Sequence, residues 1–249
     1  MLFGEVDFLE RFEAAAAAGF RSVEFLFPYA YDAQVLKTRL RDQQLLLALH
    51  NLPAGNWAAG ERGIACLRDR VDEFRAGVDQ AIEYATALEC ARLNCLAGIL
   101  PPHVDAAGAR ETLVQNLKYA APRLQSAGIR LLIEPINTRD LPGFFLSGTA
   151  QAIEIIDAVG SDNLQLQYDI YHMQIMEGDV AATIERLLPR IGHMQLADVP
   201  GRHEPGTGAI DFGSLLNHID RLGYAGWIGC EYVPSGRTSD GLGWTAPYL

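Results

Sequence analysis

Strand-like runs rich in valine, isoleucine and leucine alternate along this chain with amphipathic helical stretches. This alternation is typical of parallel βαβ units, so it restricts the fold to a parallel sheet covered by helices. One strand and its following helix occupy about 25 to 45 residues, which is the repeat length of a TIM (β/α)8 barrel. The seven expected strands are residues 21–27, 45–52, 91–98, 129–136, 164–170, 191–198 and 227–233.

Three of the intervening helices are legible from their periodicity and their ends. The first begins after Asp7 and stops at Gly19, the second covers residues 68–89, and the third covers 109–128 with Gly128 as its C-cap. Seven strands are one short of a closed barrel, and the chain opens on a helix. We therefore expect a TIM barrel whose first strand is missing from this chain, with an open doubly wound sheet as the alternative.

Composition narrows the class of protein and its partners. A chain of 249 residues that is 49% hydrophobic fits one barrel domain, residues 1–249. A net charge of -11 without a basic run argues against nucleic acid or an anionic membrane as a partner, and favours a metal cation or a small substrate. Four cysteines without CxxC spacing, no signal-peptide pattern and no apolar run of membrane-spanning length predict a cytoplasmic protein with reduced thiols. The oligomeric state, including a homo-oligomer, is left open.

Four of the expected strands end in a polar oxygen-bearing side chain. These residues are Glu134, Asp169, Gln195 and Glu231. Because the carboxyl ends of parallel barrel strands lie on one face, we expect the four side chains to converge. Three carboxylates and an amide oxygen need a positive centre, and this set of oxygen ligands suits Mg²⁺ or Mn²⁺. His193 shares a strand face with Gln195, and its participation would shift the site toward Zn²⁺ or Co²⁺.

Further polar residues are expected on the loops of the same face. His172 follows Asp169 by three residues, Asp140 follows Glu134 by six, and Arg202 lies in the polar loop PGRHEPGTG. Loops of this kind commonly bind ligands, so we predict His172, Arg202, Asp140 and, at the end of the second strand, His50 as substrate-binding residues.

The predicted metal and carboxylates indicate a reaction class. A divalent cation can polarise a carbonyl and hold an adjacent hydroxyl, while a carboxylate moves a proton between the two carbons through an enediolate. Aldose-ketose isomerisation and epimerisation require this chemistry and no organic cofactor. Glu134 and Glu231 are the predicted acid and base.

Several long stretches of the chain resemble the hydroxypyruvate isomerase family of the xylose isomerase-like TIM barrels. They are HNLPAGNWAAGERGIACL, LLIEPINTRDLPGFFL, LQLQYDIYHMQIMEGD, HMQLADVPGRHEPGTGAI and GCEYVPSGRTSDGLGW. The resemblance implies interconversion of hydroxypyruvate and tartronate semialdehyde, proton transfer by Glu134 and Glu231, and metal ligation by Glu134, Asp169, Gln195 and Glu231. It also implies a short first strand ahead of the segment MLFGEVDFLERF.

Other functions remain open at this stage. Very similar sequences are associated with 2-oxo-tetronate isomerisation in four-carbon acid sugar catabolism, a substrate that differs by one hydroxymethine group. Ketose 3-epimerisation is chemically related. The same superfamily includes abasic-site endonucleases, but these need several zinc ions, more histidines and a basic groove. A metal-binding protein without catalysis is a further alternative.

Overall fold

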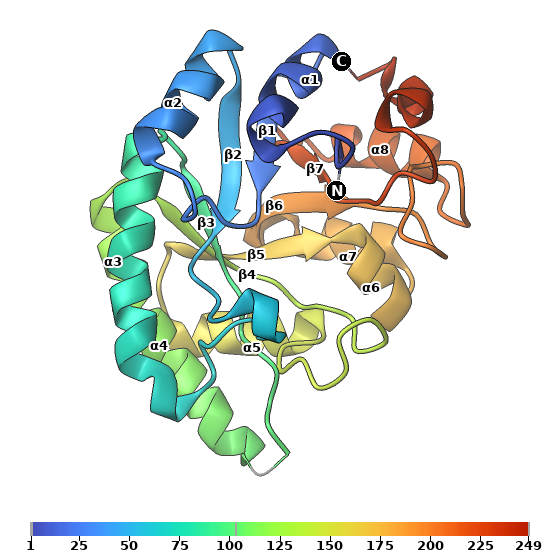
Figure 1. The fold of residues 1–249 in the computed structure, drawn as a ribbon. Helices are drawn as coiled ribbons and strands as arrows, with labels where there is room; N and C mark the ends of the chain where they lie inside the picture. The colour runs from blue at the N-terminus through green and yellow to red at the C-terminus, as the bar shows by residue number, and fades with distance from the viewer. Residues whose placement is uncertain (1, 103, 249) are drawn as a thin grey trace.

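The computed structural model describes residues 2–102 and 104–248 and contains one parallel sheet of seven strands in this part of the chain (Figure 1). All seven strands expected from the sequence are present. Their bounds are β1 Ser22–Phe25, β2 Leu46–Asn51, β3 Arg92–Cys95, β4 Arg130–Ile133, β5 Leu164–Asp169, β6 Ile191–Leu196 and β7 Ile228–Cys230.

The strands follow one another around the sheet in chain order, and every neighbouring pair is parallel. A doubly wound sheet would reverse its strand order at a switch point, so this alternative is excluded. The fold is that of a TIM barrel, as predicted. Within the described residues, no hydrogen-bonded ladder joins β7 back to β1, so the sheet does not close on itself by strand pairing.

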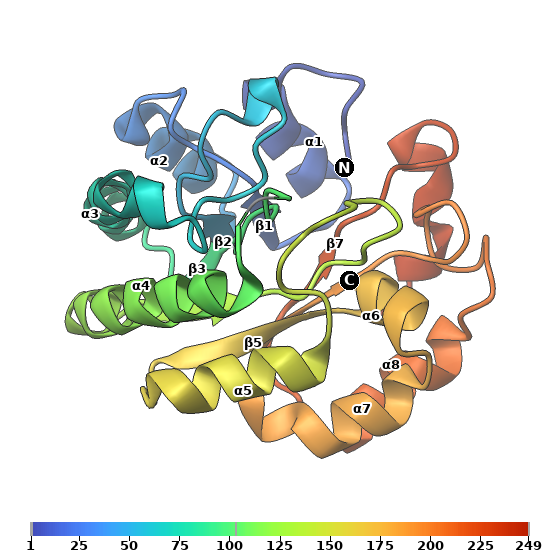
Figure 2. The ribbon, with the colours of Figure 1, turned by 90° about the horizontal axis from the view of Figure 1, so that it is seen from below.

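Helices surround the strands, as the view from below shows (Figure 2). They are α1 Arg11–Ala17, α2 Ala33–Asp42, α3 Val71–Ala87, α4 Ala106–Ser126, α5 Thr149–Val159, α6 Ile170–Met176, α7 Val180–Leu187 and α8 Phe212–Arg221. The three helices read from the sequence are α1, α3 and α4. A 3-10 turn, Phe8–Glu10, precedes α1, and Gly128 follows α4 with a φ of 73°, a left-handed conformation that favours glycine.

The two faces of the strands differ in chemistry. Outward-facing residues such as Leu93, Leu131 and Leu166 are fully buried in the main core against the helices. The inward face carries an apolar cluster of three described residues, Ala48, Leu49 and Leu132. Polar side chains occupy much of the remaining interior, whereas branched apolar residues dominate most barrels of this kind. The interior is therefore organised around polar contacts.

In the part of the chain that the structure describes, no helix has both the length and the apolar character required to cross a bilayer.

Candidate active site

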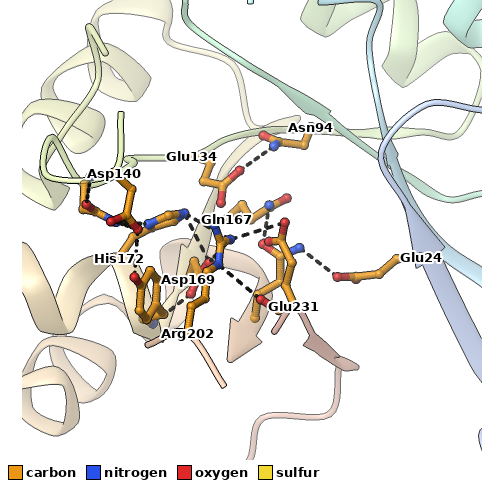
Figure 3. Close-up of polar contacts among 12 residues, drawn as sticks. Glu24, Asn94, Glu134, Asp140, Gln167, Asp169, His172, Arg202 and Glu231 are labelled. Atoms are coloured by element: carbon orange, nitrogen blue, oxygen red, sulfur yellow. Dashed lines mark hydrogen bonds and ion pairs between the residues drawn. The ribbon is translucent and has the colours of Figure 1, made fainter. Parts of the chain in front are cut away.

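Three of the four polar strand ends, Glu134, Asp169 and Glu231, lie together at the carboxyl-end mouth of the barrel (Figure 3), and Gln195 lies beside Asp169 on the neighbouring strand. Asp169 and Gln195 are register partners on β5 and β6, while Glu134 and Glu231 directly follow β4 and β7. Asp169, Glu134 and Gln195 are at most 4% exposed. Side chains from four separate strands therefore lie close together, as the sequence predicts.

Burial and mutual repulsion change the acidity of the two glutamates. Burial raises the pKa of Glu134 well above its usual value, and the neighbouring charges of Glu231 and Asp169 raise it further. Burial also raises the pKa of Glu231 to about 7, although the guanidinium of Arg202 opposes this shift. Without a cation, the mouth of the barrel therefore holds carboxyl groups that retain protons near neutral pH.

Asp169 has one carboxylate oxygen in use and one without a partner. Its Oδ1 accepts a hydrogen bond of 2.8 Å from the backbone N–H of Tyr171, which caps α6. Its Oδ2 is buried and accepts no hydrogen bond from the described residues. A buried carboxylate oxygen without a hydrogen-bond donor, next to other carboxylates, can be satisfied by binding a metal cation.

His172 joins two of the carboxylates in a cluster suited to a metal. One ligand atom each from Glu134, Asp169 and His172 lies within 4.8 Å of the others, and all three residues are buried. Sequence reasoning assigned His172 to the substrate, and the structure places its ring beside two of the predicted metal ligands. Burial lowers the pKa of His172, which keeps the imidazole neutral.

Asn137 fixes the tautomer of His172. The backbone N–H of Asp140 donates to Asn137 Oδ1 at 2.8 Å, which orients the Asn137 amide. The Asn137 Nδ2 group then donates to His172 Nδ1 at 2.7 Å and to Asp140 Oδ2 at 3.0 Å. In neutral His172 the proton therefore resides on Nε2, 3.4 Å from Asp169 Oδ2. Asp140 thus lies next to the site and contacts it through Asn137.

Arg202 provides a positive charge at the acidic cluster. Its Nη2 atom lies 3.4 Å from Glu231 Oε1 and 3.7 Å from Asp169 Oδ2. The guanidinium also lies over the Tyr171 ring, 5.1 Å from its centroid. Burial alone would lower the pKa of Arg202, but the surrounding carboxylates outweigh this effect and raise it. The backbone of Arg202 is left-handed, with a φ of 57°, so the loop holds it in a strained conformation to reach the cluster.

His50 does not lie with these residues. It is fully buried, its ring stacks on Phe25, and its Nδ1 lies 3.4 Å from the Tyr29 hydroxyl oxygen. Asn51, the next residue of β2, is the register partner of Asn94, whose side chain faces the interior. Strand alternation therefore turns His50 toward the helices.

His193 and two polar residues of the loop PGRHEPGTG have local partners. His193 Nε2 lies 2.6 Å from Glu24 Oε2 inside the barrel. His203 Nδ1 lies 2.7 Å from the Val233 carbonyl oxygen, and Glu204 accepts hydrogen bonds from Ser235. The loop that carries Arg202 is held by these contacts.

Four polar residues of this site were missed by sequence reasoning. They are Glu24, Asn94, Asn137 and Gln167. Asn94 donates a 2.8 Å hydrogen bond to Glu134 Oε2 and Gln167 donates one to Gln195, so both act on predicted ligands. The signal that could have found them is strand alternation, since each of the three on strands shares the inward face of its strand with the site.

Comparison with known proteins places this site in a family. The family model for the xylose isomerase-like TIM barrel matches residues 12–248. The chain is 55% identical to the hydroxypyruvate isomerase of Escherichia coli over 100% of this chain and 96% of that protein. It is 49% identical to the 2-oxo-tetronate isomerase of Cupriavidus necator, again over 100% of this chain and 96% of that protein.

A solved structure titled as an AP endonuclease of family 2 from Brucella melitensis superposes with a TM-score of 0.97 at 46% identity, covering 99% of this chain and 95% of that one. The sequence-based prediction of an isomerase is confirmed by the two full-length isomerase relatives. The chain belongs to the xylose isomerase-like TIM barrel family.

Proposed function

We propose that this enzyme interconverts hydroxypyruvate and tartronate semialdehyde. The observation that carries this proposal is the pair of glutamates, Glu134 and Glu231, whose pKa values are raised and which lie together with Asp169 at the mouth of the barrel (Figure 3). Identity of 55% to a hydroxypyruvate isomerase supports the substrate.

The reaction moves one proton between adjacent carbons and one between adjacent oxygens. A carboxylate removes a proton from C3 of hydroxypyruvate, which gives an enediolate across C2 and C3. A proton is then delivered to C2 while the C3 oxygen becomes the aldehyde, so no electron acceptor or organic cofactor is required. Glu134 and Glu231 are the proposed proton carriers, because a carboxyl group with a raised pKa can both accept and release a proton.

The residues present fit a divalent cation. Glu134, Asp169, Gln195 and Glu231 are the proposed ligands, with the His172 imidazole close to two of them, and the buried Asp169 Oδ2 lacks a partner among the described residues. When bound, Mg²⁺ or Mn²⁺ supplies Lewis acidity that stabilises negative charge on the substrate oxygens. The protein residues hold the cation, fix the His172 tautomer through Asn137 and move the proton.

Arg202 is the proposed partner of the substrate carboxylate. Its guanidinium is a quarter exposed at the mouth and can form a bidentate pair with a carboxylate. We expect Arg202→Ala to raise the KM for hydroxypyruvate about tenfold to a hundredfold, the effect of losing a charge-assisted hydrogen bond. Steady-state kinetics would measure this, with the exposed Arg139→Ala as the matched control. An unchanged KM would remove Arg202 from substrate binding.

A 2-oxo-tetronate is the second candidate substrate, favoured by 49% identity to a 2-oxo-tetronate isomerase. The reacting carbons are equivalent, and the larger acid adds one hydroxymethine group. Both acids carry the carboxylate that Arg202 is proposed to bind.

DNA cleavage is a weaker proposal despite the endonuclease title of one similar structure. The cluster described here combines two carboxylates with one histidine, and the chain carries a net charge of -11. Phosphate backbones require a basic surface, so an acidic small-molecule site fits this protein better. Ketose 3-epimerisation uses the same chemistry, and activity on free ketohexoses would reveal it.

The decisive experiment follows deuterium incorporation by NMR. The EDTA-stripped protein is incubated in D₂O with hydroxypyruvate, and separately with a 2-oxo-tetronate, with and without added Mg²⁺ or Mn²⁺. We expect metal-dependent product that carries solvent deuterium at the carbon next to the carbonyl, and the faster acid identifies the substrate. Absence of exchange with both acids would refute the proposed function.

A further inference from the structure

The side-chain amide of Gln195 is held at both ends inside the barrel. Its Nε2 group donates a 2.7 Å hydrogen bond to Glu24 Oε1, and its Oε1 accepts a 2.6 Å hydrogen bond from Gln167 Nε2. Gln195 is 4% exposed, so water contributes little to fixing this amide. The protein itself determines which end of the amide faces which neighbour.

Glu24 extends from β1 into the interior of the barrel (Figure 3), where it accepts the hydrogen bond from Gln195. Its second oxygen, Oε2, lies 2.6 Å from His193 Nε2, so the two carboxylate oxygens bind two residues of β6. The carboxylate passes over β7 at Gly229, where a Cβ atom would lie only 2.1 Å from Glu24 Oε1. A glycine at this position is what allows the carboxylate to approach.

We propose that Glu24 is a positioning residue that presents the oxygen of Gln195, and not its nitrogen, to the catalytic cation. This inference rests on the proposed function, in which Gln195 is a metal ligand. The two ends of an amide have almost the same shape, but only the oxygen binds Mg²⁺ or Mn²⁺. A carboxylate accepts hydrogen bonds and cannot donate them, so the Nε2 group of Gln195 must face Glu24.

The geometry leaves the Gln195 oxygen available. An amide oxygen has two lone pairs, and the hydrogen bond from Gln167 occupies one of them. Asp169, the register partner of Gln195, has its own unpartnered oxygen at the same level of the barrel. Glu24 therefore acts on the cation through Gln195 without contacting the substrate.

The test measures Mn²⁺ affinity, by electron paramagnetic resonance of free Mn²⁺, in variants of the full chain. Glu24→Met removes the acceptor at similar size, and we expect Mn²⁺ affinity to fall about tenfold or more, as for other residues that orient metal ligands. Glu24→Gln keeps an acceptor oxygen for Gln195, so its affinity should stay within about threefold of the wild type. An equal loss in both variants would assign the effect to charge and overturn the proposal.

A double-mutant cycle separates orientation from general damage. In a Gln195→Glu background both ends of the side chain are oxygens, so its orientation no longer matters. Adding Glu24→Met there should cause no further loss of Mn²⁺ affinity. The same fold loss in both backgrounds would mean that Glu24 is merely structural.

Gly229→Ala provides a second route if Glu24→Met does not fold. The added methyl group displaces the flexible Glu24 carboxylate and should weaken Mn²⁺ binding in the same direction, with exposed Gly236→Ala as the matched control because its Cβ would meet no atom within 4 Å. Unchanged Mn²⁺ affinity in Gly229→Ala would overturn the positioning role of Glu24 but would leave the proposed metal site in place. Failure of the wild-type protein to bind Mn²⁺ would remove the proposed metal site together with it.

Discussion

Replacing Glu231 with glutamine is expected to abolish turnover while only weakening metal binding. The amide keeps an oxygen that can bind a cation, but it cannot accept the substrate proton. Loss of a general base costs about 10²- to 10⁴-fold in rate, so kcat should fall by at least the lower of these factors. Its position beside the same Arg202 guanidinium as Asp169 and its pKa of about 7 make Glu231 suited to this role.

Two measurements on the Glu231→Gln variant separate its roles. Mn²⁺ titration should show retained binding of reduced affinity, while exchange of substrate hydrogen with D₂O should be lost together with turnover. Glu185→Gln, which changes a glutamate with 63% of its side chain exposed on α7, is the matched control and should behave as the wild type. Full activity of Glu231→Gln would reject the proposed base.

Removing the metal is expected to abolish activity and to make stability strongly dependent on pH. Glu231 has an ordinary pKa of 4.5 and a folded pKa of about 7, and the pKa of Glu134 is also raised. Between these values the folded state binds more protons than the unfolded state. The free energy of unfolding of the metal-free protein should therefore fall as pH rises through this window.

Cation binding reverses this trend, because it requires the ionised carboxylates. The gain in Tm on adding Mn²⁺ should be small near pH 5 and largest near pH 8, where the metal-free protein is weakened most. Thermal unfolding of EDTA-stripped protein with and without Mn²⁺ at both pH values checks this, and re-addition of the metal should restore activity. Equal gains at pH 5 and pH 8 would show that the raised carboxyl groups do not hold the cation.

The sequence was sufficient for the fold and for the convergence at the mouth of the barrel. Hydrophobic runs mark the strands, and parallel strands place their carboxyl ends on one face whatever the details of packing. Glu134 and Asp169 could thus be paired in space although 35 positions separate them in the chain.

The orientation of individual side chains was not accessible in the same way. His50 lies at the end of an apolar run, as Asp169 does. The alternation of side chains along β2, however, points His50 away from the barrel interior, toward Phe25 and the helices. Asn137 and Glu24 act through hydrogen bonds to residues 35 and 171 positions away, which depend on register and rotamer. The pattern of residue types along the chain does not by itself determine the strand register or the side-chain rotamers on which these hydrogen bonds depend.

The sparse apolar content of the barrel interior has a consequence for how this scaffold can change. With Ala48, Leu49 and Leu132 forming the inner apolar cluster, the free energy of folding comes mainly from the layer between strands and helices. Buried carboxylates at the mouth oppose folding, so we expect their exchange to affect the proposed activity more than stability. Selection can therefore vary the inner side chains nearly independently of the outer layer, which gives one architecture access to several substrates.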